Sequence, residues 1–275
     1  MSSTQKPTIL LVHGAWHGSW AWKYQIPELE SLGYATQNLD LPSVSGEAGK
    51  TQLDDAAYVR GVLEPLLAEG KQVVVLAHSY GGPIACGAIT GLSIADRARD
   101  NLPGGVLGFI NLCGYIFPGG MDQGAVIRSL GGLPYVSWDT PSPGLFVAKD
   151  PGSLFYRPDV SDQQAQWALS QLQPQSMAAN MGIVPPQAWQ EEAYIGRLAY
   201  IKATEDAVIP FSDQESMISS SGGSEAWNTR VLEGSGHSPQ ISRPSEVAQA
   251  VDSLIQDFQF TNEGNRPDYD LGVEC

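Results

Sequence analysis

Short hydrophobic runs bounded by glycine or other turn residues recur along the chain. The clearest are TILLV, QVVVLA and GVLGFINL, which are rich in β-branched residues and leucine. This texture is typical of strands that are buried on both faces. Three further segments show the same strand-like pattern more weakly. Together the strand-like segments are residues 8–12, 34–39, 72–77, 105–112, 198–203 and 229–232.

Segments whose apolar residues follow helical spacing lie between these runs. They are residues 27–32, 53–69, 84–93, 212–219 and 244–258. Strands that alternate with helices are typical of a parallel sheet with helices packed on its faces. The pattern therefore predicts an α/β fold.

Residues 114–193 interrupt this alternation. They contain many glycines, prolines and aromatic residues and an amphipathic piece at residues 161–172, without a strong strand signal. We expect a helical cap inserted between the two parts of one α/β core, residues 1–113 and 194–260. The remaining residues, 261–275, have little apolar surface to bury, which predicts a flexible tail.

The charge of the chain argues against several kinds of partner. Thirty Asp and Glu residues stand against fifteen Lys and Arg, a net charge of -15, and the basic residues form no cluster. A nucleic-acid surface needs a basic patch, and anionic lipid would repel this chain. No apolar run approaches the roughly 18 residues of a membrane span. We expect no nucleic-acid or membrane partner, and a homodimer is left open.

The cysteines and the start of the chain bear on the compartment. Cys86, Cys113 and Cys275 are far apart and form no CxxC motif. An odd number of widely spaced cysteines indicates neither a disulfide framework nor a zinc site, and it fits a reducing compartment. The polar residues 1–7 contain no hydrophobic stretch of the kind found in secretory signals. We expect a cytoplasmic protein.

A serine follows the clearest strand and precedes a glycine-rich helix start. The motif AHSYG, residues 77–81, matches the GxSxG nucleophile elbow with alanine in place of the first glycine. The tight turn of such a motif lifts the serine above the sheet, where the helix N-terminus faces it. Ser79 is therefore the candidate nucleophile, and the alternative is a serine that only caps a helix.

The four histidines of the chain allow a general base to be sought by elimination. His78 adjoins Ser79, so its side chain should point away from the serine, and His13 and His17 flank the end of the first strand. His237 lies in a glycine-rich loop after the last strand-like segment. α/β sheets place their sites on this carboxyl side of the strands. We expect His237 to be the base.

The acid that orients this base should also follow a strand and should lie between Ser79 and His237 in the chain. The segment Thr204-Glu205-Asp206 satisfies both conditions. Asp206 is the choice and Glu205 the fallback. The alternative is a solvated acidic turn.

The end of the first strand, HGAWHG, supplies donors for an oxyanion. The backbone N–H groups of Ala15 and Tyr80 would flank a negatively charged oxygen next to Ser79, and Gly14 permits the turn. The alternative is an ordinary strand exit.

Other patterns would indicate a metal or a cofactor. His13 and His17 stand four residues apart, but they flank a strand end and lack the carboxylate of an HExxH motif. The glycines form neither the GxGxxG pattern of dinucleotide sites nor a phosphate-binding loop. We expect no metal and no cofactor.

With HGAWHGSW, AHSYGG, TEDAVIP and GSGH in this order, the chain resembles the α/β-hydrolase superfamily, and most closely its methylesterase and hydroxynitrile lyase branch. Residues 8–92 and 196–256 carry the resemblance. It implies a mostly parallel eight-stranded sheet with helices on both faces, a helical cap over the site, and a triad of Ser79, Asp206 and His237. The order of these three along the chain is that of α/β-hydrolases.

Two positions separate the hydrolases of this branch from its lyases. Hydroxynitrile lyases of this type carry Thr where this sequence has Gly14, and Lys where it has Ser238. The absence of both favours a serine hydrolase that cleaves an ester, lactone or thioester through an acyl-enzyme. A cofactor-free carbon–carbon lyase or hydrolase and a ligand-binding receptor on the same fold remain as alternatives, because they share the acid–base groups.

Aromatic and methionine side chains are abundant in residues 114–193. We expect some of them to line a pocket for a hydrophobic small molecule, together with residues at the exit of the first strand. The candidates are His13, Trp16, Phe117, Trp138, Trp167, Met181 and Trp189. Most aromatic residues of the segment should pack the cap itself, because amphipathic helices bury one face.

Overall fold

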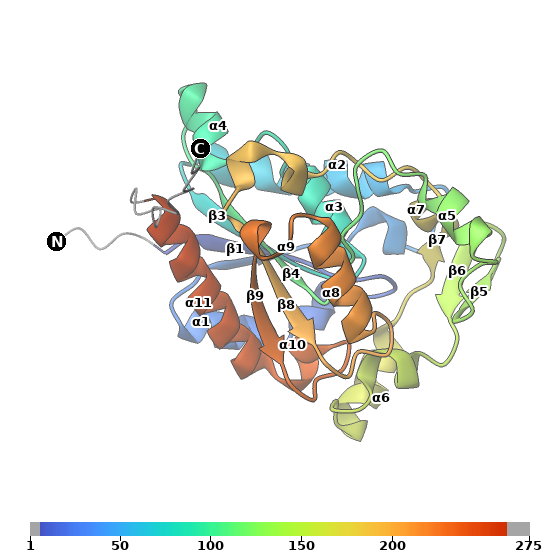
Figure 1. Ribbon diagram of the computed structural model, residues 1–275. Helices are drawn as coiled ribbons and strands as arrows, with labels where there is room; N and C mark the ends of the chain where they lie inside the picture. Colours follow the sequence, from blue (N-terminus) through green and yellow to red (C-terminus); the bar gives the residue numbers. More distant parts are fainter. Residues whose placement is uncertain (1–5, 263–275) are drawn as a thin grey trace, which may run out of the picture.

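The computed structural model describes residues 6–262 and is built around one large sheet. Six parallel strands form this sheet in the order β2-β1-β3-β4-β8-β9 (Figure 1). They are β1 (Thr8–Val12), β2 (Thr36–Asn38), β3 (Gln72–His78), β4 (Gly105–Leu112), β8 (Leu198–Ala203) and β9 (Trp227–Leu232). Each coincides with a strand-like segment of the sequence.

The strand count implied by the resemblance is wrong. Within the described residues the sheet contains six strands rather than eight. The hydrophobic pattern indicates the same six segments, so the local sequence is a better guide to the size of this sheet than the resemblance.

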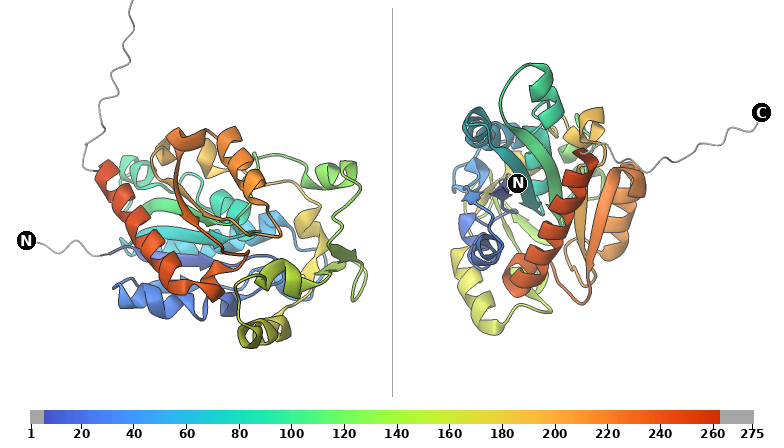
Figure 2. Two further views of the ribbon diagram at one scale, coloured as in Figure 1. Left: turned by 60° about the horizontal axis from the view of Figure 1, so that its bottom comes forward. Right: turned by 90° about the vertical axis from the view of Figure 1, so that its left-hand side faces the viewer.

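Helices cover both faces of the sheet. Those of the α/β core are α1 (Gln25–Ser31), α2 (Gln52–Ala68), α3 (Gly81–Ala88), α4 (Ile94–Arg99), α8 (Phe211–Ser220), α9 (Gly223–Ala226), α10 (Pro239–Ser242) and α11 (Pro244–Asn262), with two short helical turns, η1 (Ser19–Trp22) and η2 (Pro42–Val44). In Figure 1, α1 and α11 lie side by side, and the right-hand view of Figure 2 looks onto α11 where it crosses the sheet.

The strands divide their side chains between these two helix layers. In β1, Ile9 and Leu11 pack on the face covered by α1 and α11, whereas Leu10 and Val12 pack on the face covered by α2 and α3. All four side chains are fully buried. This is the alternation that a strand imposes, and burial on both sides explains why the strands read as continuous hydrophobic runs.

The chain leaves the sheet after β4 and returns at β8, and we call the segment between these strands the insert. It contains α5 (Gln123–Ser129), β5 (Val136–Trp138), β6 (Leu145–Ala148), η3 (Gly152–Tyr156), α6 (Asp162–Gln171), β7 (Gln175–Ser176), α7 (Met177–Asn180), η4 (Ala188–Gln190) and η5 (Glu192–Tyr194). Figure 1 shows α5, β5 and β6 at the end of the molecule opposite the N-terminus.

Besides its helices, the insert contains strands that the sequence did not indicate, because β5, β6 and β7 form a small antiparallel sheet. These strands have only three, four and two residues. Such short strands complete too few alternations of apolar and polar residues to be recognised in a sequence.

The predicted flexible tail, residues 261–275, lies almost entirely outside the described residues. Its first two residues continue α11, which ends at Asn262. None of the helices within residues 6–262 combines the length and the apolar character needed to cross a bilayer.

Candidate active site

The order of the strands determines where a site can form. From β1 the chain moves to β2 on one side and then crosses to β3 on the other side of β1. The connections after β1 and β3 therefore run in opposite directions and open a crevice at the carboxyl ends of these strands. Gly14 and Ala15 follow β1, and Ser79 follows β3.

Ser79 is held in a sharp turn between β3 and α3. Its φ is +53°, in the left-handed region that a residue with a side chain rarely adopts. Gly81 allows this turn to lie against β1, because a Cβ at that position would stand 2.5 Å from the His13 carbonyl oxygen. The serine is consequently fixed above the sheet at the start of a helix, with 6% of its surface exposed.

Ser79, His237 and Asp206 form one chain of hydrogen bonds. The Ser79 hydroxyl donates to His237 Nε2 at 2.9 Å, and His237 Nδ1–H donates to Asp206 Oδ2 at 2.8 Å. The three residues follow β3, β9 and β8, which are separate strands of the same sheet. The structure therefore brings together the three residues that the sequence pattern selects.

Asp206 occupies the place next to the histidine, and Glu205 does not. The Asp206 side chain is buried, and its Oδ1 accepts from the backbone N–H groups of Val208 at 2.8 Å and Ile209 at 2.9 Å. Glu205 points to solvent. With Oδ1 held by the backbone, Oδ2 is left to orient the imidazole.

Ala15 follows β1, Tyr80 directly follows Ser79, and both residues line the same cavity as the serine. Their backbone N–H groups are the predicted oxyanion donors. Neither donates a hydrogen bond to another residue in the described part of the chain. Gly14, beside them, packs closely against the site: a Cβ there would lie 2.9 Å from His78 Nδ1 and 3.0 Å from Ser79 Cβ. Any side chain at this position would have to displace one of these two residues.

All four histidines of the chain are buried around this crevice. Burial lowers the pKa of His13 to about 4 and that of His17 to about 3. It holds the pKa of His78 well below its ordinary value. These three rings are therefore neutral at pH 7.

The hydrogen bonds of the first two histidines leave no ring nitrogen for a metal ion. His13 donates from Nδ1 to the Gly14 carbonyl at 2.8 Å and accepts from the Leu41 N–H at 2.9 Å. His17 donates from Nδ1 to the Ala15 carbonyl at 2.7 Å and accepts from the Tyr156 hydroxyl at 3.1 Å. Every nitrogen of the pair is used in fixing the ring and the turn after β1.

The prediction that His78 points away from the site is wrong. Its Nε2–H donates to the backbone carbonyl of His237 at 2.7 Å, and the two ring centroids are 4.9 Å apart. Although neighbouring side chains of a strand point to opposite faces, this rule fails at residue 79, where the strand ends in a left-handed turn. His78 thus supports the loop that carries the proposed base.

The insert also holds this loop. The carboxylate of Asp159, just before α6, accepts hydrogen bonds from the Gly236 N–H at 3.1 Å and from Arg243 Nε at 2.9 Å. It also accepts from the hydroxyls of Ser235 at 3.2 Å and Ser242 at 2.8 Å. The Asp159 carboxylate therefore bonds to residues that precede His237 in the chain and to residues that follow it.

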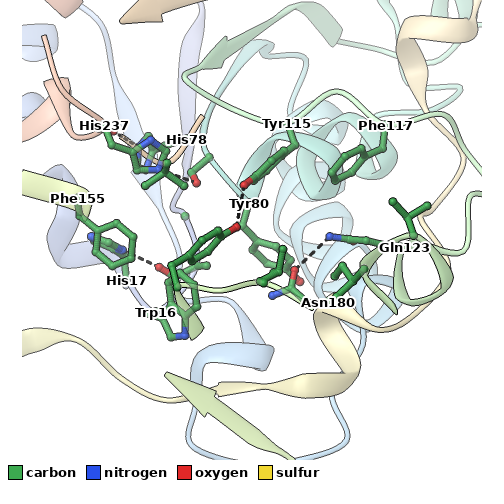
Figure 3. Close-up of a pocket in the computed structure, with 18 of the residues that line it drawn as sticks. Trp16, His17, His78, Tyr80, Tyr115, Phe117, Gln123, Phe155, Asn180 and His237 are labelled. Carbon is green, nitrogen blue, oxygen red and sulfur yellow. Dashed lines mark hydrogen bonds between the residues drawn. The ribbon is translucent and has the colours of Figure 1, made fainter. Parts of the chain in front are cut away.

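A cavity of about 200 Å³ lies above Ser79 and is largely apolar. Its walls come from the exits of β1, β3, β8 and β9 and from the insert. Figure 3 shows Trp16, His17 and Phe155 on the side of His237, with Phe117, Gln123 and Asn180 on the other. Of the candidate pocket residues, the structure places Trp16 and Phe117 in this lining.

The other candidates do not line the cavity, and each has a different partner. His13 bonds to Leu41, Trp138 stacks on Phe146 with centroids 5.2 Å apart, and Trp167 meets Trp20 edge-on at 5.5 Å. Trp189 donates to the Phe117 carbonyl at 3.1 Å, and Met181 directly follows α7, where its backbone packs against Gly124. The three tryptophans among these residues pack the insert and its junction with the core.

Several lining residues were missed by the sequence reasoning. Tyr115 could have been found, because it follows β4 at the same edge of the sheet as Ser79. Phe155, Gln123 and Asn180 carry no such signal, since their positions depend on how the insert folds.

Comparison with known proteins identifies the family that has this architecture. Residues 9–250 match the model of the alpha/beta hydrolase family. The chain belongs to this family. Among curated relatives of this hydrolase, norfluorocurarine synthase 2 from Strychnos sp. is 28% identical over 93% of this chain and 97% of its own length. Methyl jasmonate esterase 1 from Vitis vinifera is 24% identical over 90% of this chain and 97% of its own.

Solved structures give the same fold for the hydrolase. A methylesterase from Arabidopsis superposes with a TM-score of 0.70 at 19% identity, over 91% of this chain and 99% of the other. Polyneuridine aldehyde esterase also gives 0.70 at 19% identity, with the same coverage. The methylesterase side of the resemblance inferred from the sequence motifs is confirmed.

Proposed function

We propose that this hydrolase cleaves carboxylic esters, including lactones and thioesters, of small hydrophobic molecules. The observation that carries the proposal is the relay from Ser79 through His237 to Asp206, with bonds of 2.9 and 2.8 Å, at the base of an apolar cavity. The names of similar proteins, methyl jasmonate esterase and methylesterases among them, support the same class of bond.

In the proposed reaction, Ser79 Oγ attacks the carbonyl carbon of the ester while its proton passes to His237 Nε2. The carbonyl oxygen becomes an oxyanion, for which Ala15 and Tyr80 offer their backbone N–H groups. Collapse of this intermediate breaks the bond to the leaving oxygen, which takes the proton from His237. Water then attacks the acyl-enzyme by the same route and releases the acid, with Asp206 stabilising the imidazolium in both halves.

Release of cyanide, the alternative chemistry in this branch, is less compatible with the site. The Cβ of a threonine at position 14 would crowd Ser79 and His78, and Ser238, where the lyases carry Lys, is fully buried. No Lys or Arg among the described residues lines the cavity, so a departing anion would lack a cation.

The proposal is tested with a fluorophosphonate probe and peptide mass mapping, alongside turnover of p-nitrophenyl and methyl esters. We expect labelling at Ser79, none in Ser79→Ala, and hydrolysis of apolar esters. A receptor on this fold would bind such esters without turning them over. A folded protein that neither reacts with the probe nor hydrolyses any ester would refute the proposal.

A further inference from the structure

Two amide side chains stand at the end of the cavity remote from the proposed base. Gln123 begins α5 and Asn180 ends α7, and both line the cavity. Each has only 8% of its surface exposed. Figure 3 shows the pair side by side, on the side of the pocket away from His237. Their neighbours in the lining include the apolar side chains of Met121 and Ile127.

Hydrogen bonds join these amides in one series that runs from the core to the cavity. Gln52, from α2 of the core, donates from Nε2 to Gln123 Oε1. Gln123 in turn donates from Nε2 to Asn180 Oδ1 at 3.3 Å. The series ends at the Asn180 amide nitrogen, which donates to no other residue in the described part of the chain. Asn180 therefore offers N–H donors, and not its oxygen, to a bound molecule.

A donor of this kind is costly in an apolar pocket unless a ligand supplies an acceptor. The acceptor should carry no charge. No Lys or Arg of residues 6–262 lines the cavity, and burial lowers the pKa of the nearby His17 to about 3, so the pocket offers no cation to balance a carboxylate.

We infer that Asn180, oriented by Gln123, is a specificity-determining residue that donates a hydrogen bond to an uncharged carbonyl oxygen at the end of the substrate remote from the ester. The inference rests on the proposed ester hydrolysis and names its substrate class: esters with an apolar body and a distal ketone. Ester cleavage at Ser79 and recognition at Asn180 then occur at opposite ends of one cavity.

The test compares methyl esters of straight-chain oxo acids, with the ketone four to eight carbons from the ester, with methyl alkanoates of equal length. For the best-fitting chain length we expect kcat/KM to favour the oxo ester by at least about 10-fold, since a site built for a polar group discriminates against an analogue that lacks it. In Asn180→Leu, which keeps the volume and removes the donors, this ratio should fall about 10-fold or more.

Matched variants control for indirect effects. Asn228→Leu makes the same chemical change on the edge strand β9, outside the cavity lining, and should keep the parent ratio. If Asn180→Leu does not fold, Gln123→Met removes the partner that orients Asn180 and should also lower the ratio. A parent ratio near one at every chain length, or a ratio that a folded Asn180→Leu leaves unchanged, overturns the inference.

Failure of the proposed function would look different, because neither series of esters would be hydrolysed. Binding to Ser79→Ala, followed by calorimetry, reports on Asn180 in either case. We expect the oxo ester to bind at least about 10-fold more tightly than the alkanoate, and this preference to be lost in the Ser79→Ala/Asn180→Leu double variant. Equal affinities of Ser79→Ala for the two esters would refute the role of Asn180 without reference to turnover.

Discussion

The core and the insert contribute to the site through different contacts. Core residues at the ends of β3, β8 and β9 meet through hydrogen bonds of 2.8 and 2.9 Å between named atoms. The insert contributes mainly ring packing, such as Phe155 stacked on Trp16 with centroids 5.4 Å apart. Directional bonds fix reacting atoms, whereas packed rings fix a shape. The core is therefore suited to define the reaction, and the insert to define the molecule that undergoes it.

Some insert residues also make directional bonds to the core, and Asp159 is the one that bonds to the loop carrying His237. Substitutions in the core and in the insert test this division of roles.

The largest effect is expected from the proposed nucleophile and the proposed base, both in the core. Ser79→Ala and His237→Ala should each lower kcat/KM for an apolar ester by roughly 10⁴-fold or more, since the two act as one unit. Circular dichroism and thermal unfolding check that each variant is folded. A folded Ser79→Ala protein with near-parent turnover would show that the reaction does not depend on these strand ends.

Removing the charge of Asp206 should cost less, roughly 10²- to 10⁴-fold in kcat, because this carboxylate orients the imidazole and forms no bond to substrate. Asp206→Asn is compared with Glu205→Gln, which changes the exposed neighbour. The steady-state kcat should drop in Asp206→Asn and not in Glu205→Gln. The reverse result would assign the orienting acid to Glu205.

Asp159→Ala tests whether the insert affects the rate of the chemical step. Loss of its bonds to Gly236 and Arg243 should let the His237 loop move, and a misplacement of about 1 Å lowers kcat by roughly 10²-fold. Asp162→Ala, at an exposed ion pair with Arg157 in the same part of the insert, is the control and should leave kcat unchanged. If the two variants have equal kcat values, the insert affects only substrate choice.

The neutral histidines predict that the protein loses stability in mild acid. Between pH 6.5 and about 4 an unfolded His13 binds a proton that the folded protein, with its lowered pKa, does not. Unfolding therefore takes up protons, and the free energy of unfolding falls with falling pH by about 1.4 kcal/mol per pH unit for each such histidine. For His17 the window extends to about pH 3, where its pKa lies in the folded protein.

Urea unfolding at pH 7, 6, 5 and 4 measures this dependence. His17→Gln keeps hydrogen-bonding groups without the titrating ring, so its stability should fall less steeply by about 1.4 kcal/mol per pH unit. Asp55, whose pKa is raised by burial, acts in the opposite sense, but it is present in both proteins and cancels in the comparison. Parallel curves for parent and variant would contradict the buried, neutral state of His17.

The smallest expected effect is a change in stability at Gly61, where the core leaves space for a side chain. A Cβ at Gly61, on the exposed side of α2, meets no atom within 4 Å. Gly61→Ala should therefore raise the free energy of unfolding by about 1 kcal/mol, through helix propensity alone. Gly14→Ala is its counterpart beside the site and should lower activity. A destabilised Gly61→Ala would show that α2 is under strain that the packing does not reveal.

The sequence predicted the core part of the site better than the insert. Ser79, Asp206 and His237 each follow a strand, and the parallel order of the strands carries their ends to one edge. Local patterns therefore determined which residues meet. The same logic could not apply to Trp167 or Trp189, because a tryptophan in an insert packs equally well against its own segment, against the core or around a ligand.

Gln123 and Asn180 illustrate the limit more sharply. They are 57 residues apart in the chain, and neither follows a strand of the large sheet. Only the folding of α5 against α7 makes them a pair. Similarly, Asp159 lies 78 residues before His237 in the chain, and no motif connects them.

The four histidines offer a spectroscopic view of the site. Their hydrogen bonds assign Nδ1–H to His13, His17 and His237, and Nε2–H to His78 alone. Nitrogen-15 spectra of protein labelled only at histidine would thus contain signals from this crevice and from nowhere else in the chain. The single Nε2–H pattern would identify His78 without mutagenesis, and its chemical shift would follow the backbone of His237 while ligands bind and leave.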